Sequence, residues 1–144
     1  MSTSSDVRRL VLRNNLAELR RLAVWVERWT KGGVPPNLSF ALQLCLEEAV
    51  ANVIMYGATD GELKIAIELE RRDRTLVARI EDNGQPFDPT LVAPHPLPST
   101  LKDAKIGDLG IHLVRSFASQ MDYERRHGQN RLTLRFEEQI GPAP

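Results

Sequence analysis

The stretch EEAVANVIMYG, residues 47–57, decides how the chain folds, because polar side chains interrupt an otherwise apolar helix there. At about 100° per residue, an apolar stripe follows one side of this helix. Its members are Leu38, Leu42, Cys45, Leu46, Ala49 and Val53. Glu48 and Asn52 are four residues apart and lie one above the other at the edge of the stripe, whereas Glu47 is expected to face solvent. An acid and an amide placed in this way can line a cleft, or they can border an ordinary amphipathic helix.

Composition indicates one soluble globular domain that covers residues 1–144, with an ordered core at about residues 7–137. Lys and Arg together equal Asp and Glu, and this zero net charge argues against a general binder of nucleic acid or of a membrane surface. The single Cys45 excludes an intrachain disulfide. We see no signal-peptide pattern and no apolar run near eighteen residues, so we expect a cytoplasmic protein.

The segments before the central helix predict one strand and one helix. Residues 7–12 indicate a short strand whose arginines suit the edge of a sheet. A helix is expected from about residue 14 to about residue 30. The two prolines at 35–36 predict an extended connection, after which Asn37 caps the central helix.

Two alternating segments follow and predict a pair of strands. Apolar and polar residues alternate over residues 63–70 and again over residues 76–82. The alternation that turns Ile80 inward also turns Asp82 inward at the end of its strand. Because an unpaired buried carboxylate is costly, Asp82 needs a partner, either a functional one or a structural cap on the next loop.

The last part of the chain predicts a lid, a third helix and a closing hairpin. Residues 85–108 are rich in proline and show little pattern, which is typical of a functional lid. A helix is expected over residues 111–120, followed by strands over residues 121–126 and 131–137 with a turn at 127–130. The fold class is therefore α/β, a two-layer sandwich of three helices on a mostly antiparallel sheet of about five strands.

Three short motifs occur in a fixed order along this predicted fold. They are Glu48-x-x-x-Asn52 on the central helix, Asp82-Asn83-Gly84 at a strand end, and Gly107-x-x-Gly110 before a helix. Each motif is weak alone. Together they resemble the N, G1 and G2 boxes of the GHKL ATPase superfamily, in which ATP lies between a helical layer and a flexible lid.

A closer resemblance is to the small bacterial anti-sigma factor serine kinases. The segments that carry it are EAVAN at 48–52, EDNGQPFDP at 81–89 and LGIHLVR at 109–115. The resemblance extends over about residues 7–137. It implies the Bergerat ATP-binding fold, with ATP and Mg²⁺ as cofactors.

The resemblance also implies roles for individual residues. Asn52 supplies an amide oxygen to Mg²⁺, a hard ion that prefers oxygen ligands. Asp82 accepts a hydrogen bond from the adenine amine, and Gly84 lets the backbone approach the base. Glu48 is the general base that activates a serine hydroxyl of a partner protein.

The phosphate-binding part of the resemblance falls on the segment after the lid. Gly107, Leu109 and Gly110 belong to the motif that presents backbone N–H groups to phosphate at a helix N-terminus. Asp108 departs from the family, which commonly has glycine there, and its carboxylate repels the triphosphate unless Mg²⁺ or a lid lysine screens it. Thr133 is placed either near adenine or as an ordinary strand residue.

The resemblance implies an ATP-dependent serine kinase that acts in a partner-switching module. It would phosphorylate a serine of a STAS-domain anti-anti-sigma protein and sequester a partner such as a sigma factor, as a homodimer. The alternative is a non-catalytic, nucleotide-gated protein-binding regulator of the same fold. Glu48 favours the kinase, because a binding module does not need that carboxylate.

Overall fold

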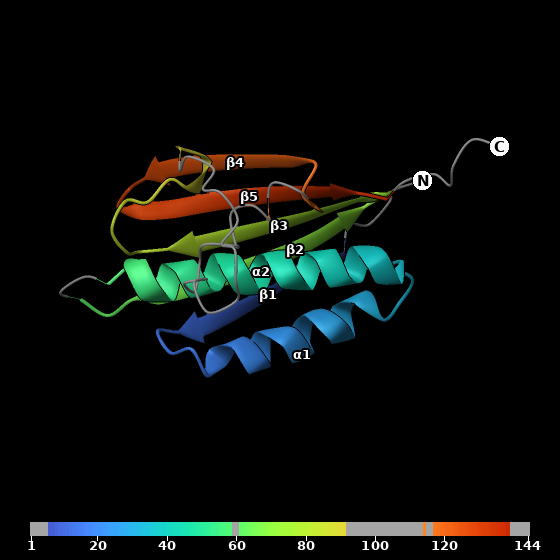
Figure 1. The fold of residues 1–144 in the computed structure, drawn as a ribbon, viewed down its shortest axis with the longest axis horizontal. Helices are drawn as coiled ribbons and strands as arrows, with labels where there is room; N and C mark the ends of the chain where they lie inside the picture. Colours follow the sequence, from blue (N-terminus) through green and yellow to red (C-terminus); the bar gives the residue numbers. More distant parts are fainter. Residues whose placement is uncertain (1–5, 59–60, 92–113, 115–116, 139–144) are drawn as a thin grey trace, which may run out of the picture.

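The computed structural model describes residues 6–58, 61–91, 114 and 117–138, and its main feature is a five-stranded sheet packed against two long helices (Figure 1). The strand order is β1-β2-β3-β5-β4, and all neighbouring strands are antiparallel. In chain order the elements are β1 (Asp6–Arg13), α1 (Glu18–Thr30), α2 (Pro36–Tyr56), β2 (Lys64–Arg72), β3 (Thr75–Asp82), the short 3₁₀ helix η1 (Pro89–Leu91), β4 (Gln120–Arg126) and β5 (Gln129–Glu137). The predicted two-layer α/β fold is confirmed.

Alternation along the strands places one face of the sheet against the helices. Ile80 of β3 stands opposite Ile67 of β2 and Leu132 of β5. Ile67 and Ile80 are buried, and Leu132 packs against the same core. Asp82 follows on this face and is 6% exposed, so the predicted inward carboxylate is confirmed.

The central helix α2 begins earlier than expected. Pro36 is its first residue, and Pro35 before it has an extended conformation, so the predicted cap at Asn37 is wrong. The physical reason is that proline lacks an N–H and has a fixed φ, both of which suit the first helical turn. Burial extends to Val50 and Ala51, beyond the predicted stripe. The helix is long and apolar enough to cross a membrane, but packing in the core accounts for this composition.

The closing hairpin is tighter than predicted. Only His127 and Gly128 lie between β4 and β5, and both have positive φ, as a two-residue hairpin turn requires. Asn130, expected in the turn, therefore belongs to β5. β4 starts at Gln120, where the third helix was expected to end. Of residues 111–120 the structure describes 114 and 117–120; residues 114 and 117 are helical, whereas 118–120 are not.

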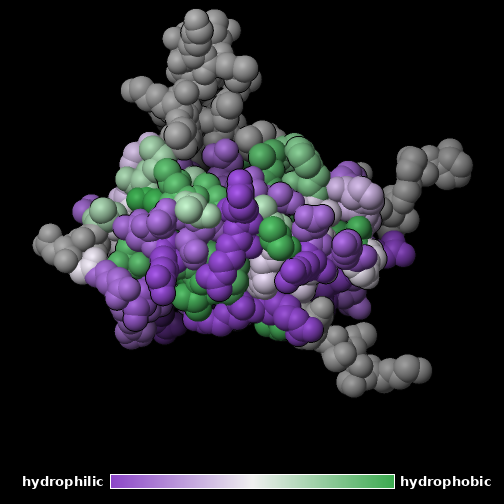
Figure 2. Space-filling view, turned by 90° about the horizontal axis from the view of Figure 1, so that it is seen from below, coloured by the Kyte–Doolittle hydropathy of each residue, from purple (hydrophilic) through white to green (hydrophobic). Residues whose placement is uncertain are grey.

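β1 is the edge strand, as predicted, and it pairs with β2 along its whole length. Arg21 of α1 donates a hydrogen bond to the Val11 carbonyl at 3.1 Å, and Glu18 accepts one from the Arg13 N–H at 3.1 Å. Figure 2 views the molecule from the side of α1 and β1 and shows hydrophilic side chains with smaller apolar groups between them. Part of the open strand edge is thus already satisfied by α1.

Candidate nucleotide site

A pocket opens between the C-terminal half of α2 and the ends of β3 and β5. Its volume is about 600 Å³, including the part that is open to solvent. Its walls include Ala49, Asn52, Tyr56, Ile80, Asp82 and Leu132. A mostly apolar pocket with a few convergent polar groups is the usual form of a small-molecule site.

Asn52 is the polar group that α2 contributes to the pocket. It is 7% exposed, and within the described residues its side-chain amide makes no hydrogen bond. The amide atoms are not sealed in the core, because the pocket they line is open to solvent, so a ligand in the pocket can form hydrogen bonds with them. The amide oxygen is also a suitable ligand for a hard cation.

Glu48 lies one turn before Asn52 on the same side of α2. It is not among the residues that line the pocket. Burial, and to a lesser extent the charge of Glu47, raise the pKa of the Glu48 carboxyl. A raised pKa makes a carboxylate a better proton acceptor. Glu47, which was expected to be solvated, is half-buried and accepts a hydrogen bond from Gln43 at 3.3 Å.

Asp82 forms the polar centre of the opposite wall. Its Oδ1 accepts hydrogen bonds from the Gly84 N–H and from the Asn130 amide, each at 2.9 Å. Its Oδ2 has no hydrogen bond within the described residues, so one oxygen of a buried carboxylate remains available in the pocket. Burial raises the pKa of Asp82, while Asn130, Gly84 and the charge of Arg125 act in the opposite direction.

Asn130 holds this centre together, and it is 5% exposed. Besides Asp82, its amide donates to the Gln85 carbonyl at 2.8 Å. Its Oδ1 accepts a hydrogen bond from the Tyr123 hydroxyl. The Asn130 side chain thus joins β4, β5 and the loop after β3.

Gly84 is required for a close backbone contact. A Cβ at this position would lie 2.4 Å from the Gly57 carbonyl oxygen and 2.9 Å from Asp82 Oδ1. The Gln85 N–H donates to that same Gly57 carbonyl at 3.2 Å. The absence of a side chain therefore lets the loop after β3 lie directly on the C-terminal end of α2, a contact that the sequence did not predict.

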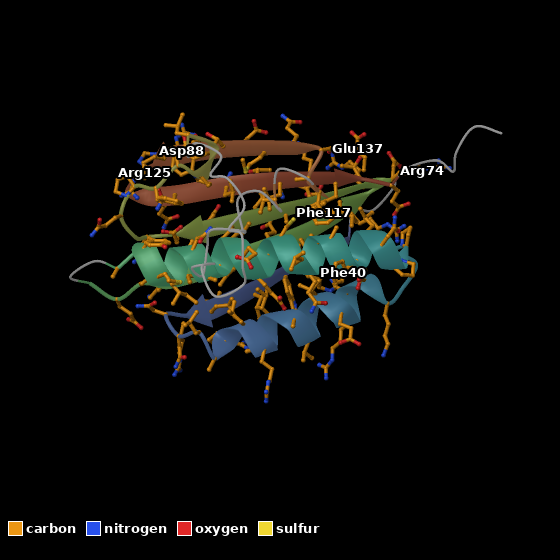
Figure 3. The ribbon with its side chains drawn as sticks, in the orientation of Figure 1. Phe40, Arg74, Asp88, Phe117, Arg125 and Glu137 are labelled. Carbon is orange, nitrogen blue, oxygen red and sulfur yellow. The ribbon has the colours of Figure 1, made fainter. Side chains whose placement is uncertain are left out.

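Two further contacts shape this end of the molecule. The rings of Tyr56 and Phe87 stack with centroids 6.2 Å apart, and both line the pocket. Arg125 donates a hydrogen bond to the Gly84 carbonyl at 2.7 Å. Figure 3 shows Arg125 and Asp88 at the same end of the sheet.

Thr133 is not part of the pocket, and its expected place near adenine needs correction. It stands opposite Arg79 of β3, whereas Leu132 stands opposite Ile80. Neighbouring residues of a strand point to opposite faces, so Thr133 faces away from the helices. The position facing Asp82 belongs to Asn130.

Several predicted residues lie outside the described part of the chain. They are Gly107, Leu109 and Gly110 of the phosphate motif and the neighbouring Asp108. Their predicted roles remain predictions. Within the described residues, no three His, Cys, Asp or Glu side chains gather into a metal site.

Sequence reasoning missed Asn130 and Tyr123. The inward alternation of Leu134 and Leu132 leads to Asn130, but the predicted strand began one residue too late to include it. Tyr123 lies two residues after Met121 on β4, and both side chains line the pocket. This alternation was visible in the sequence and could have placed Tyr123 on the inner face of its strand. Only the pairing of β5 with β3 shows that Asn130 meets Asp82.

Comparison with known proteins identifies sequences and structures that are similar to this chain. Residues 12–136 match the family described as the histidine kinase-like ATPase domain. The serine/threonine-protein kinase BtrW of Bordetella bronchiseptica is 37% identical over 109 residues, which cover 75% of this chain and 73% of BtrW.

Among solved structures, the histidine kinase domain of the Erythrobacter litoralis EL346 blue-light activated histidine kinase superposes with a TM-score of 0.55 at 14% identity. The match covers 88% of this chain and 61% of that one, and likeness at this identity shows the fold alone. The family match covers most of the sequence, including the pocket. The chain therefore belongs to the family of histidine kinase-like ATPase domains.

Proposed function

We propose that this chain is an ATP-dependent protein serine kinase, acting in the cytoplasm, that phosphorylates a STAS-domain antagonist and sequesters a partner such as a sigma factor. The observation that carries the proposal is the buried Asp82 carboxylate, whose Oδ2 is open to a pocket that also contains Asn52. Family membership and the likeness to a protein named as a serine/threonine kinase support it.

The order of the polar groups along α2 supports a particular orientation of ATP. At about 1.5 Å per residue, Asn52 lies about 7.5 Å and Glu48 about 13.5 Å along the helix from Gly57, which contacts the Asp82 loop. Adenine at Asp82 therefore directs the phosphates toward Asn52 and places the terminal phosphate nearest Glu48.

The described residues divide the reaction between recognition and proton transfer. Asp82 Oδ2 accepts a hydrogen bond from the adenine amine, and the Asn52 amide oxygen would hold Mg²⁺, which would supply positive charge to neutralise the phosphates. Glu48 accepts the proton of the partner's serine hydroxyl. The serine oxygen then forms a bond to the γ-phosphorus as the bond to the bridging oxygen of ADP breaks.

The experiment combines the protein, Mg²⁺ and γ-labelled ATP with the STAS-domain protein encoded nearest to its gene. We expect label on a serine of that protein, and a loss of at least a hundredfold in rate for Glu48→Gln. Glu47→Gln is the matched control, since it removes the adjacent carboxylate on the same helix and should retain transfer. Undiminished transfer by Glu48→Gln contradicts the kinase mechanism.

ATP binding without transfer by the wild-type protein would instead support the nucleotide-gated regulator. In that case Mg²⁺-ATP should raise the midpoint of thermal unfolding, as any ligand specific for the native state does. Absence of this shift would remove the nucleotide site itself.

The proposed homodimer uses β1 and its neighbours. The edge position of β1 supports this arrangement, because an edge strand has backbone groups free of strand pairing. Light scattering at several protein concentrations tests it, and a monomer mass throughout would contradict it.

A further inference from the structure

We propose that Tyr123 is a positioning residue that makes the pocket select a 6-amino purine, acting through Asn130 on Asp82. The inference rests on the proposed binding of ATP and adds a determinant of base selectivity. It follows from one chain of hydrogen bonds, from the Tyr123 hydroxyl to Asn130 Oδ1 and from the Asn130 amide to Asp82 Oδ1.

The first step concerns the orientation of the Asn130 amide. Its N–H groups meet two acceptors, Asp82 Oδ1 at 2.9 Å and the Gln85 carbonyl at 2.8 Å. A flipped amide would point its oxygen at both acceptors, so these two acceptors select the orientation in which Oδ1 faces Tyr123 and accepts a hydrogen bond from its hydroxyl. The donated hydrogen bond from Tyr123 therefore stabilises the one orientation that serves Asp82.

The second step concerns the Asp82 carboxylate. Oδ1 already accepts two hydrogen bonds, from Gly84 and Asn130, so the carboxylate is fixed with Oδ2 directed to the remaining space. An acceptor held in this way pairs with an amine donor and does not pair with a purine that lacks the amine. Loosening Asn130 frees the carboxylate to rotate and favours its protonation, and a protonated oxygen can donate instead of accept.

The third step concerns the place of Tyr123 itself. It lies on β4 opposite Leu132 of β5, is half-buried, and its ring is part of the pocket wall. Tyr123→Phe keeps this ring and removes only the hydroxyl. The variant therefore tests the hydrogen bond separately from the packing.

The experiment measures the dissociation constants of Mg²⁺-ATP and of the Mg²⁺ complex of purine riboside triphosphate, which has hydrogen in place of the 6-amino group. We expect Tyr123→Phe to weaken ATP binding about tenfold and analogue binding less than about twofold. The matched control is Thr133→Val, which removes a hydroxyl from the opposite face of the sheet and should keep the wild-type ratio. If Tyr123→Phe weakens the binding of both nucleotides equally, so that the ratio of their dissociation constants is unchanged, the inference is overturned.

A double-mutant cycle then tests whether Tyr123 acts through Asn130. If it does, Tyr123→Phe adds no further loss of selectivity to Asn130→Ala. If the losses of selectivity in the two single variants add up in the double variant, Tyr123 does not act through Asn130. Failure of the wild-type protein to bind ATP would instead contradict the proposed function. Tight ATP binding, with the same ratio of the two dissociation constants in Tyr123→Phe as in the wild type, contradicts only the role of Tyr123.

Discussion

The two ends of the sheet use buried polar groups in different ways. At the site end, defined by Asp82, Gly84 and Asn130, hydrogen bonds fix a carboxylate but leave one of its oxygens without a described partner. At the closed end, Arg71 donates to Glu138 at 2.7 Å and to the Gly33 carbonyl at 3.2 Å. Figure 3 shows residues of the closed end, Arg74 and Glu137, far from Arg125 at the site end.

The comparison distinguishes polar groups that stabilise the fold from polar groups that are available to bind a ligand. The closed end pairs a cation with an anion and joins β2 to the connection between α1 and α2, so its charges are neutralised within the chain. The site end retains a carboxylate whose pKa is raised by burial, so its charged form costs stability in the absence of a ligand. Substitutions at the closed end should therefore reduce stability alone, while most substitutions at the site end should change binding.

Gly84→Ala should have the largest effect, because it breaks the site end sterically. The new Cβ would lie 2.4 Å from the Gly57 carbonyl oxygen, and we expect a loss of about 3 kcal/mol in unfolding free energy together with loss of ATP binding. Denaturant unfolding and calorimetry measure both. Gly32→Ala, near the closed end, has nothing within 4 Å of its Cβ and should be neutral or slightly stabilising. Equal effects of the two variants would contradict the close contact.

Asp82→Asn should change binding without reducing stability. The amide keeps an acceptor for Gly84 and Asn130 but turns a donor toward the adenine amine, so we expect about a hundredfold weaker ATP binding. The unfolding free energy of the ligand-free protein should be unchanged or higher, since a buried charge is removed. Glu138→Gln is the control at the closed end and should leave ATP affinity unchanged. A stability loss for Asp82→Asn as large as that for Gly84→Ala would refute this assignment.

Arg71→Met should show the reverse pattern. It removes the hydrogen bonds to Glu138 and Gly33 while keeping an apolar stem, and the partly exposed pair suggests a loss of about 1 kcal/mol in unfolding free energy. ATP affinity should be retained. Arg74→Met removes an exposed arginine from the same end and should be nearly neutral. Weaker ATP binding by Arg71→Met would mean that the two ends are coupled.

The smallest expected effect is a pH dependence from Asp82. Burial raises its pKa in the folded chain, with Arg125 and two hydrogen bonds partly opposing this. Its contribution to stability is thus fully present below the pKa of an unfolded aspartate and is lost as pH rises through the folded pKa. The stability gained by Asp82→Asn should therefore grow as pH rises across this interval. In the wild-type protein, ATP binding should weaken as acid protonates Asp82. A stability difference that shrinks with rising pH would contradict the sign.

Local periodicity predicted much of the site as well as the fold. A spacing of four placed Glu48 and Asn52 on one side of α2, and a spacing of two turned Asp82 inward. The motifs also identified the family, which the comparisons confirm. The sequence could not show that Thr133 faces away from the pocket, because this depended on which residue of β5 pairs with Arg79.

The sequence by itself thus determined the helix face, the inward carboxylate and the order of the strands along the chain, since these follow from periods of a few residues. The tertiary structure alone decided that Asn130 meets Asp82, 48 residues away, that Tyr123 orients Asn130, and that Gly84 lies on Gly57. These contacts depend on cross-strand register and on close backbone packing. Both are set when the sheet closes on α2, because only the assembled core fixes which distant residues share a space.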